Sequence, residues 1–235
     1  MLLRGRPVKH PNGRAARRVH NTLDMLPAMT DFELVHFDES LLVVNKPAGL
    51  LSVPGKGAGQ LLNLTSMLRH QFADLQVVHR LDQATSGLML FARNANVQRS
   101  LSMAFERRQV HKRYMAVVNG LVADEEGVIE APLAADWPRR PRQMVDPDKG
   151  KPSVTRWNVV QRETSTTRLL LEPVTGRSHQ LRVHMQFMGH PILGDGLYGE
   201  AAASEPGRLL LHATQLSFCH PVTGAELVLH SAAPF

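Results

Sequence analysis

The chain has 235 residues, which is enough for one large domain or two small ones. Hydrophobic residues make up 43% of the sequence and charged residues 20%, as in ordinary soluble globular proteins. No apolar run approaches the roughly 18 residues that a membrane-spanning helix needs, so we expect no membrane span. The one cysteine, Cys219, excludes an internal disulfide and favours a reducing, cytoplasmic location.

The net charge of +6 is concentrated at the N-terminus. Residues 1–20 contain six basic residues and no acidic residue, whereas the rest of the chain carries no net charge. Such a segment either contacts polyanions or is a solvated arm, and composition does not separate the two. An organellar transit peptide is a weaker alternative, because the segment lacks serine and contains Pro7 and Pro11. We predict a basic, flexible tail over residues 1–30 and one folded domain over residues 31–235.

The first half of this domain is expected to contain three strands and two helices. Short apolar runs predict strands at residues 32–37, 41–45 and 88–92, the last one following a turn. A helix is predicted over residues 59–72. A second helix is expected to begin after Asn94, which is a good N-cap, and to bury an apolar face formed by Val97, Leu101, Ala104 and Phe105.

The second half is expected to be mostly strands. Ser178 is the predicted N-cap of a helix that runs to Met188 and stops at Gly189. Residues 137–151 are rich in proline and arginine and are predicted to form a surface loop. Further strands are predicted at residues 114–118, 127–132, 154–160, 169–172, 209–218 and 226–230.

The predicted elements define a fold class. Strands outnumber helices, and they do not alternate with helices in the strict rhythm of a parallel sheet. We therefore predict an α+β domain built around a largely antiparallel mixed sheet, flanked by helices and loops.

Several common functional motifs are absent. The glycine-rich residues 55–59 lack the Gly-Lys-Ser/Thr ending of a phosphate-binding loop. His179, His184 and His190 lack the glutamate and the spacing of a zinc helix, so we read them as surface or RNA-facing residues and expect no metal. Ser86 is not surrounded by a nucleophile-elbow motif.

One segment combines charge with turn residues in an unusual way. Arg80 and Asp82 lie two residues apart between apolar runs, and Thr85-Ser86-Gly87 follows as a predicted turn. Loops on rigid scaffolds are favoured places for catalysis. By itself, however, an aspartate in a turn is more often a local hydrogen-bond acceptor than a nucleophile.

This segment resembles the signature of the RluA family of pseudouridine synthases, which is His-Arg-Leu-Asp followed by Thr-Ser-Gly. Five further blocks resemble the family in the family's order, at residues 45–50, 111–114, 175–182, 189–195 and 209–213. The resemblance implies the pseudouridine synthase fold, with its active site in a central cleft of the catalytic domain, residues 31–235. It also implies an isomerase that needs no cofactor and acts on RNA.

The resemblance further suggests which RNA is modified and which residues act. The run at residues 50–55 is similar to that of short members that modify uridines in tRNA and large-subunit (23S-type) rRNA stem-loops. Asp82 would be the nucleophile, Arg177 the cation that keeps it ionised, and Tyr114 the ring that stacks on the flipped base and assists removal of the C5 proton. Arg80 would fill the space that the base leaves, and Leu211 would pack beneath the uracil.

Four basic residues near the predicted second helix are candidates for holding phosphates, namely Arg107, Arg108, Lys112 and Arg113. A solvated helix face explains them nearly as well. Without the resemblance, Tyr114 and Leu211 would be read as core residues, Arg177 as a surface charge, and Arg80 as a member of a structural ion pair. The alternative function is a non-catalytic RNA-binding protein or RNA chaperone on the same fold. A monomer is the expected state.

Overall fold

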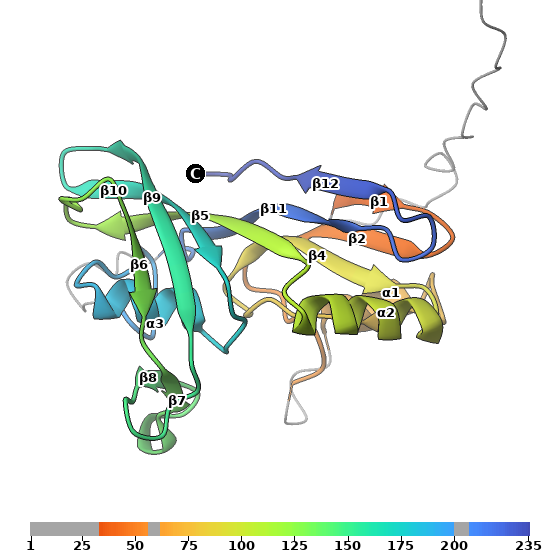
Figure 1. The fold of residues 1–235 in the computed structure, drawn as a ribbon, viewed down its shortest axis with the longest axis horizontal. Helices are drawn as coiled ribbons and strands as arrows, with labels where there is room; N and C mark the ends of the chain where they lie inside the picture. The colour runs from red at the N-terminus through yellow and green to blue at the C-terminus, as the bar shows by residue number, and fades with distance from the viewer. Residues whose placement is uncertain (1–32, 56–61, 200–206) are drawn as a thin grey trace, which may run out of the picture. The chain divides into compact units, whose positions relative to one another are not determined.

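The structure is a computed structural model that describes residues 33–55, 62–199 and 207–235, all within one compact unit of the chain (Figure 1). The predicted tail, residues 1–30, and the first part of the helix predicted over residues 59–72 lie outside the described residues. In the described part no helix is long and apolar enough to cross a membrane.

A ten-stranded sheet forms the body of the domain, with the strand order β1-β2-β4-β11-β5-β10-β9-β6. In addition β3 pairs with β4, and β12 pairs with β11. The ten strands are β1 (Glu33–Phe37), β2 (Leu41–Lys46), β3 (Gln76–Val77), β4 (Ser86–Ala92), β5 (His111–Asn119), β6 (Glu126–Glu130), β9 (Val154–Arg162), β10 (Thr166–Pro173), β11 (Leu211–Cys219) and β12 (Glu226–His230).

The pairing is antiparallel throughout this sheet except between β4 and β11, which are parallel. A small second sheet pairs β7 (Leu133–Ala135) with β8 (Gln143–Val145). Three α-helices complete the described fold: α1 (Leu64–Arg69), α2 (Ala95–Glu106) and α3 (Gln180–Phe187). Figure 1 shows α1 and α2 toward one end of the large sheet and α3 toward the other. The predicted α+β class with a largely antiparallel mixed sheet is confirmed.

Strands β2 and β4 are continuous apolar runs because both of their faces are covered. Alternate residues of β4 belong to different clusters: Met89 and Phe91 join the core that also contains Leu64 of α1, whereas Leu88 and Leu90 join the core that contains Val97 and Leu101 of α2. Since successive side chains of a strand point to opposite faces, a strand buried on both faces has no polar alternation.

The parallel junction between β4 and β11 depends on a glycine. Gly87 pairs with Ala213 and has a φ of +111°, and a Cβ at this position would collide with the backbone of Ala213. Ser86, its neighbour, hydrogen-bonds through Oγ to Nδ1 of His212 at 2.8 Å. The turn predicted at Thr85-Ser86-Gly87 is therefore wrong for its last two residues, which are the first two residues of β4.

The helices follow the sequence signals in part. Asn94 caps α2 as predicted, because its side chain accepts a hydrogen bond from the Val97 amide at 3.0 Å. Helix α1 was predicted to begin at residue 59, but it begins at Leu64, with Asn63 as its N-cap. Helix α3 also begins later than predicted: its N-cap is His179, which has a left-handed backbone, and not Ser178. Gly189, with a φ of +86°, follows the end of α3 as predicted.

The predicted surface loop at residues 137–151 is wrong in part. It contains a short 3₁₀ turn at Trp137–Arg139 and then β8, which pairs with β7. We refer to residues 133–145 as the β7–β8 hairpin. Strands of three residues are too short to produce a recognisable alternation, so neither β7 nor β8 could be found from hydrophobic pattern.

Candidate active site

A pocket of about 590 Å³ lies between the loop that precedes β4, the start of β5 and the residues that lead into α3. Seven of the nine residues predicted to form the site line it: Arg80, Asp82, Arg108, Lys112, Tyr114, Arg177 and Leu211. A second, adjoining pocket of about 350 Å³ also includes Asp82 and Arg80, together with Arg140, Pro141 and Gln143 of the β7–β8 hairpin. Asp82, Arg80 and His179 therefore line both hollows.

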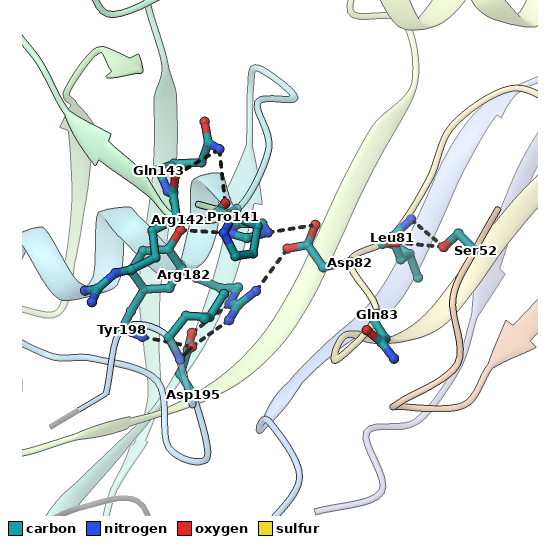
Figure 2. Close-up of polar contacts among 12 residues, drawn as sticks. Ser52, Leu81, Asp82, Gln83, Pro141, Arg142, Gln143, Arg182, Asp195 and Tyr198 are labelled. Carbon is teal, nitrogen blue, oxygen red and sulfur yellow. Dashed lines mark hydrogen bonds and ion pairs between the residues drawn. The ribbon is translucent and has the colours of Figure 1, made fainter. Parts of the chain in front are cut away.

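The backbone before Asp82 is clamped by Ser52. The hydroxyl of Ser52 donates to the carbonyl of Leu81 at 2.7 Å and accepts from the amide of Leu81 at 3.1 Å (Figure 2). Ser52 and Leu81 are both buried. One side chain thus satisfies both backbone groups of the residue that precedes the carboxylate.

The backbone after Asp82 is held by the end of β2 and the residues that follow it. The carbonyl of Gln83 accepts hydrogen bonds from the amide of Gly49 at 2.8 Å and from Nζ of Lys46 at 3.1 Å. Lys46 is fully buried and also donates to the carbonyls of Pro47 and Leu50, at 2.8 and 2.7 Å. Burial lowers the pKa of Lys46 to about 8, although the nearby negative charge of Asp82 opposes that shift.

The charge partner of Asp82 is Arg182, which corrects the prediction of Arg177. Nη1 of Arg182 lies 3.6 Å from Oδ2 of Asp82. Arg177 lines the same pocket but is exposed, and its Nε donates to the carbonyl of Pro152 at 3.3 Å. Arg177 precedes α3 and points along the surface, whereas Arg182 belongs to α3 and points inward.

Arg182 is locked in place by a buried carboxylate. Its Nε and Nη2 donate to the two oxygens of Asp195 at 2.7 and 2.6 Å, a bidentate arrangement (Figure 2). Burial alone would lower the pKa of Arg182, but the hydrogen bonds and charge of Asp195, together with the charge of Asp82, raise it above the usual value. Arg182 therefore presents a permanent positive charge to Asp82.

His179 is a second polar neighbour of Asp82 that sequence reasoning did not assign to the site. Its Nε2 lies 3.9 Å from Oδ1 of Asp82, and its Nδ1 lies 2.7 Å from the hydroxyl of Tyr198. That hydroxyl also accepts a hydrogen bond from the amide of Gln143 at 2.7 Å. Burial lowers the pKa of His179, against the opposing effect of the Asp82 charge.

The apolar part of the pocket comes from β5 and β11. Tyr114 and Leu211 are both buried and line the pocket. Burial, reinforced by the charge of Asp82, raises the pKa of the Tyr114 hydroxyl above its usual value, so the phenol is protonated in the resting site. The pocket thus offers an aromatic ring and an aliphatic side chain beside a carboxylate.

The predicted cationic residues separate into two groups. Arg80, Arg108 and Lys112 line the pocket. The alternative reading of Arg80 was a structural ion pair, but in the described part of the chain Arg80 forms none. Arg107, at the end of α2, and Arg113 do not line it, and Nε of Arg113 lies 3.7 Å from Glu172. Burial lowers the pKa of Lys112.

Two further histidines belong to the scaffold. His79 accepts a hydrogen bond from the amide of Leu90 at 2.9 Å and stacks on Phe105, and burial lowers its pKa to about 3. His184 was read as a surface or RNA-facing residue, which is wrong: it is buried and bonded to Thr155 and to the carbonyl of Ala131.

Comparison with known proteins identifies the family. A model of the RNA pseudouridylate synthase family matches residues 40–187. The dual-specificity RNA pseudouridine synthase RluA of Vibrio parahaemolyticus is 51% identical over 195 residues, which cover 80% of this chain and 78% of the relative. The protein of the same name from Escherichia coli is 43% identical over 205 residues, which cover 86% of this chain and 93% of the relative.

A solved structure agrees with the sequence matches. Human RNA pseudouridylate synthase domain containing 1 has a TM-score of 0.74 and 29% identity to this chain, covering 90% of this chain and 87% of the human one. The predicted resemblance to the RluA family, the isomerase activity and RNA as substrate are thereby confirmed. The chain belongs to the RNA pseudouridylate synthase family.

Proposed function

We propose that this enzyme isomerises specific uridines in tRNA and in large-subunit rRNA stem-loops, with Asp82 as nucleophile. The relatives from Vibrio parahaemolyticus and Escherichia coli are named dual-specificity enzymes, which supports two classes of RNA substrate. The observation that carries the proposal is the carboxylate of Asp82, which lies in an open pocket within 3.6 Å of a fixed guanidinium and is bordered by an aromatic and an aliphatic side chain.

The reaction breaks the bond between N1 of uracil and C1′ of ribose, turns the base, and joins C5 to C1′, with loss of the C5 proton. A carboxylate nucleophile divides this exchange into easier steps, by attack either at the ribose or at the base. Asp82 must be ionised for either attack. Because burial favours the protonated acid, the permanent charge of Arg182 is what keeps Asp82 reactive in this proposal.

Tyr114 and Leu211 would enclose the uracil once it has left the RNA stack. Extruding a base costs a few kcal/mol, least where it is already unpaired, which suits a loop uridine. Arg80, exposed at the pocket mouth, would occupy the space that the base leaves. Tyr114 enters the reaction as a protonated phenol, so we infer that it relays the C5 proton and is not a preformed base.

Arg108 and Lys112 would contact phosphates on either side of the target nucleotide, because both border the pocket. We further propose that residues 1–30 form a basic arm that adds RNA affinity to the catalytic domain, residues 31–235. We also propose that the enzyme is a monomer and that it acts in the cytoplasm.

The experiment is release of the C5 hydrogen from RNA labelled at C5 of uridine, with a tRNA transcript and an rRNA stem-loop as separate substrates. The wild-type enzyme should release label from both. Asp82→Asn should bind RNA and unfold as the wild type does but release label at least about a thousandfold more slowly, because it keeps the shape and removes the nucleophilic charge. Near-normal release by Asp82→Asn would remove the nucleophile assignment, and release from one RNA class alone would remove the dual specificity.

A further inference from the structure

His179 has a backbone conformation that side chains other than glycine rarely adopt. Its φ is 54°, in the left-handed region, and among the described residues Arg108 is the one other non-glycine residue with positive φ. Such conformations cost free energy and persist where the surroundings impose them, often at functional sites. At the N-cap of α3 this conformation places the imidazole on the wall shared by both pockets.

The hydrogen bonds around the ring decide which of its nitrogens carries the proton. The amide of Gln143 donates to the hydroxyl oxygen of Tyr198, so the phenolic proton is free to point toward Nδ1 of His179. With Nδ1 as the acceptor, the imidazole proton lies on Nε2. The opposite tautomer would direct the lone pair of Nε2 at the carboxylate of Asp82, which is unfavourable.

The two oxygens of Asp82 therefore face two different donors. Nε2 of His179 lies 3.9 Å from Oδ1. Nη1 of Arg182 lies 3.6 Å from Oδ2, as the dashed line between Arg182 and Asp82 in Figure 2 shows. Both separations are longer than a hydrogen bond, as is common in catalytic sites without substrate. A carboxylate held at one oxygen can still rotate about its Cβ–Cγ bond, whereas one held at both cannot.

Asp195 supports both donors. Its carboxylate binds Arg182 directly, and its Oδ1 also accepts from the amides of Leu197 and Tyr198 at 3.0 and 3.1 Å. One buried side chain thus fixes the guanidinium and, through the backbone of Tyr198, the hydroxyl that orients His179. The donor to Oδ1 and the donor to Oδ2 are consequently kept at a constant spacing.

We infer that His179 is a positioning residue for the nucleophile: its Nε2–H, oriented by the hydroxyl of Tyr198, holds Oδ1 of Asp82 while Arg182 holds Oδ2. The inference rests on the proposed role of Asp82. It assigns to the β7–β8 hairpin a part in the chemistry, because the amide of Gln143 in β8 sets the direction of the Tyr198 proton. His179 does not exchange a proton with substrate in this arrangement.

The charged and titratable groups around this pair come from every neighbouring element. They are Lys46 of β2, Arg80 of the loop before β4, Tyr114 of β5, Arg182 of α3, and Asp195 and Tyr198 of the segment after α3. In the described part of the chain, Arg182 is the one of these groups that forms an ion pair with Asp82, and it does so at Oδ2 and not at Oδ1. Loss of the imidazole should therefore leave Oδ1 of Asp82 without a facing donor.

The first test uses His179→Asn and His179→Gly, which both tolerate a left-handed backbone. Asparagine can still reach Tyr198 but is too short to reach Asp82, and glycine removes the side chain and the strain together. At saturating RNA the single-turnover rate should fall about tenfold or more, and the acid limb of the pH–rate profile should move to higher pH. RNA affinity should be unchanged, and the unfolding temperature of His179→Gly should not fall.

His190→Asn is the matched control, because His190 bonds to the carbonyl of Asn119 and lines neither pocket. It should retain the wild-type rate and acid limb. Tyr198→Phe should cause a smaller loss of rate than His179→Gly, since the imidazole remains but its tautomer is no longer fixed. A merely structural role for His179 would lower stability and leave the acid limb in place.

A readout independent of activity is the ¹⁵N spectrum of the His179 imidazole in the full-length enzyme. The expected spectrum shows an unprotonated Nδ1 and a protonated Nε2, and a proton on Nδ1 overturns the inference. The inference is also overturned if both His179 variants keep the wild-type rate and acid limb while Asp82→Asn is inactive. That result would leave the proposed function intact. An active Asp82→Asn would instead overturn the proposed nucleophile, and with it the role of His179.

Discussion

Nη1 of Arg182 lies 3.6 Å from Oδ2 of Asp82, and the same guanidinium is bound by both oxygens of Asp195. The arginine thus stands between the buried carboxylate of Asp195, which holds it, and the more exposed carboxylate of Asp82, the proposed nucleophile. This arrangement separates anchoring from catalysis, because the strong bidentate contact is made to Asp195 and the looser one to the proposed nucleophile.

Arg182 and Arg177 should therefore respond differently to substitution. Arg182→Lys keeps the charge but cannot bind Asp195 in the same bidentate way, so the ammonium is displaced from Asp82; we expect a loss of kcat of about a hundredfold and an acid limb at higher pH. Arg177→Met should leave the acid limb unchanged and weaken RNA binding alone. Single-turnover pH profiles check both variants. A shifted acid limb in Arg177→Met together with an unshifted acid limb in Arg182→Lys would show that Arg177, and not Arg182, is the charge partner of Asp82.

Ser52→Ala should destabilise the protein and impair the site together. Removing the hydroxyl leaves the buried amide and carbonyl of Leu81 without their partner, which should lower the free energy of unfolding by about 2–4 kcal/mol. The turnover rate should also fall, since the residue before Asp82 loses its clamp. Ser153→Ala is the control: Ser153 is also buried, but its hydroxyl bonds only to the nearby Lys151 carbonyl, so urea unfolding should show a smaller loss and the rate should not change.

Two histidines with a lowered pKa make stability depend on pH. Burial lowers the pKa of His79 to about 3 and that of His212 to about 4, below the ordinary value of 6.5. Below pH 6.5 the unfolded chain takes up protons that the folded chain does not, so the free energy of unfolding falls as the pH falls toward 4, by up to about 1.4 kcal/mol per pH unit for each histidine. Urea unfolding at pH 7, 6 and 5 measures how steeply the free energy of unfolding depends on pH. His212→Gln should reduce this slope by the contribution of one histidine, and an unchanged slope would contradict the lowered pKa of His212.

The basic tail should contribute affinity and not chemistry. If the six cations of residues 1–20 all contact single-stranded phosphates, they add at most about 4 to the slope of log affinity against log salt, at about 0.7 per contact. Deleting residues 1–20 should weaken RNA binding and flatten this dependence, with no change in the single-turnover rate at saturating RNA. Equal affinity and an equal slope in the truncated enzyme would make the segment a solvated arm.

The parts of the fold that could be predicted are those with a strong local signal. Leu41 to Val44 and Leu88 to Ala92 are apolar without interruption, and Asn94 is followed by apolar residues at helical spacing, so β2, β4 and the start of α2 were found. The β7–β8 hairpin was not found, because its strands are short and its sequence is rich in proline and arginine.

The candidate site could be predicted as a motif but not as a geometry. The matched blocks predicted that Asp82, Tyr114 and Leu211 belong to one site. One of these blocks contains both Arg177 and Arg182, and the sequence does not indicate which of the two arginines points inward. That choice depends on the left-handed backbone of His179, which starts α3 one residue later than the Ser178 cap would. One signal was available: Arg182 stands between Leu181 and Val183, and a buried arginine requires an acidic partner.

The clamp between Ser52 and Leu81 joins residues 29 apart, and the contact between Ser86 and His212 joins residues 126 apart. Contacts of such long range form late relative to local ones during folding. As the chain is synthesised from its N-terminus, Asp82 emerges about a hundred residues before its charge partner Arg182, and Asp195 and Leu211 follow later still. A nascent chain that ends before β11 should therefore be catalytically silent, because it lacks Leu211 and the strand that pairs with β4 and β5.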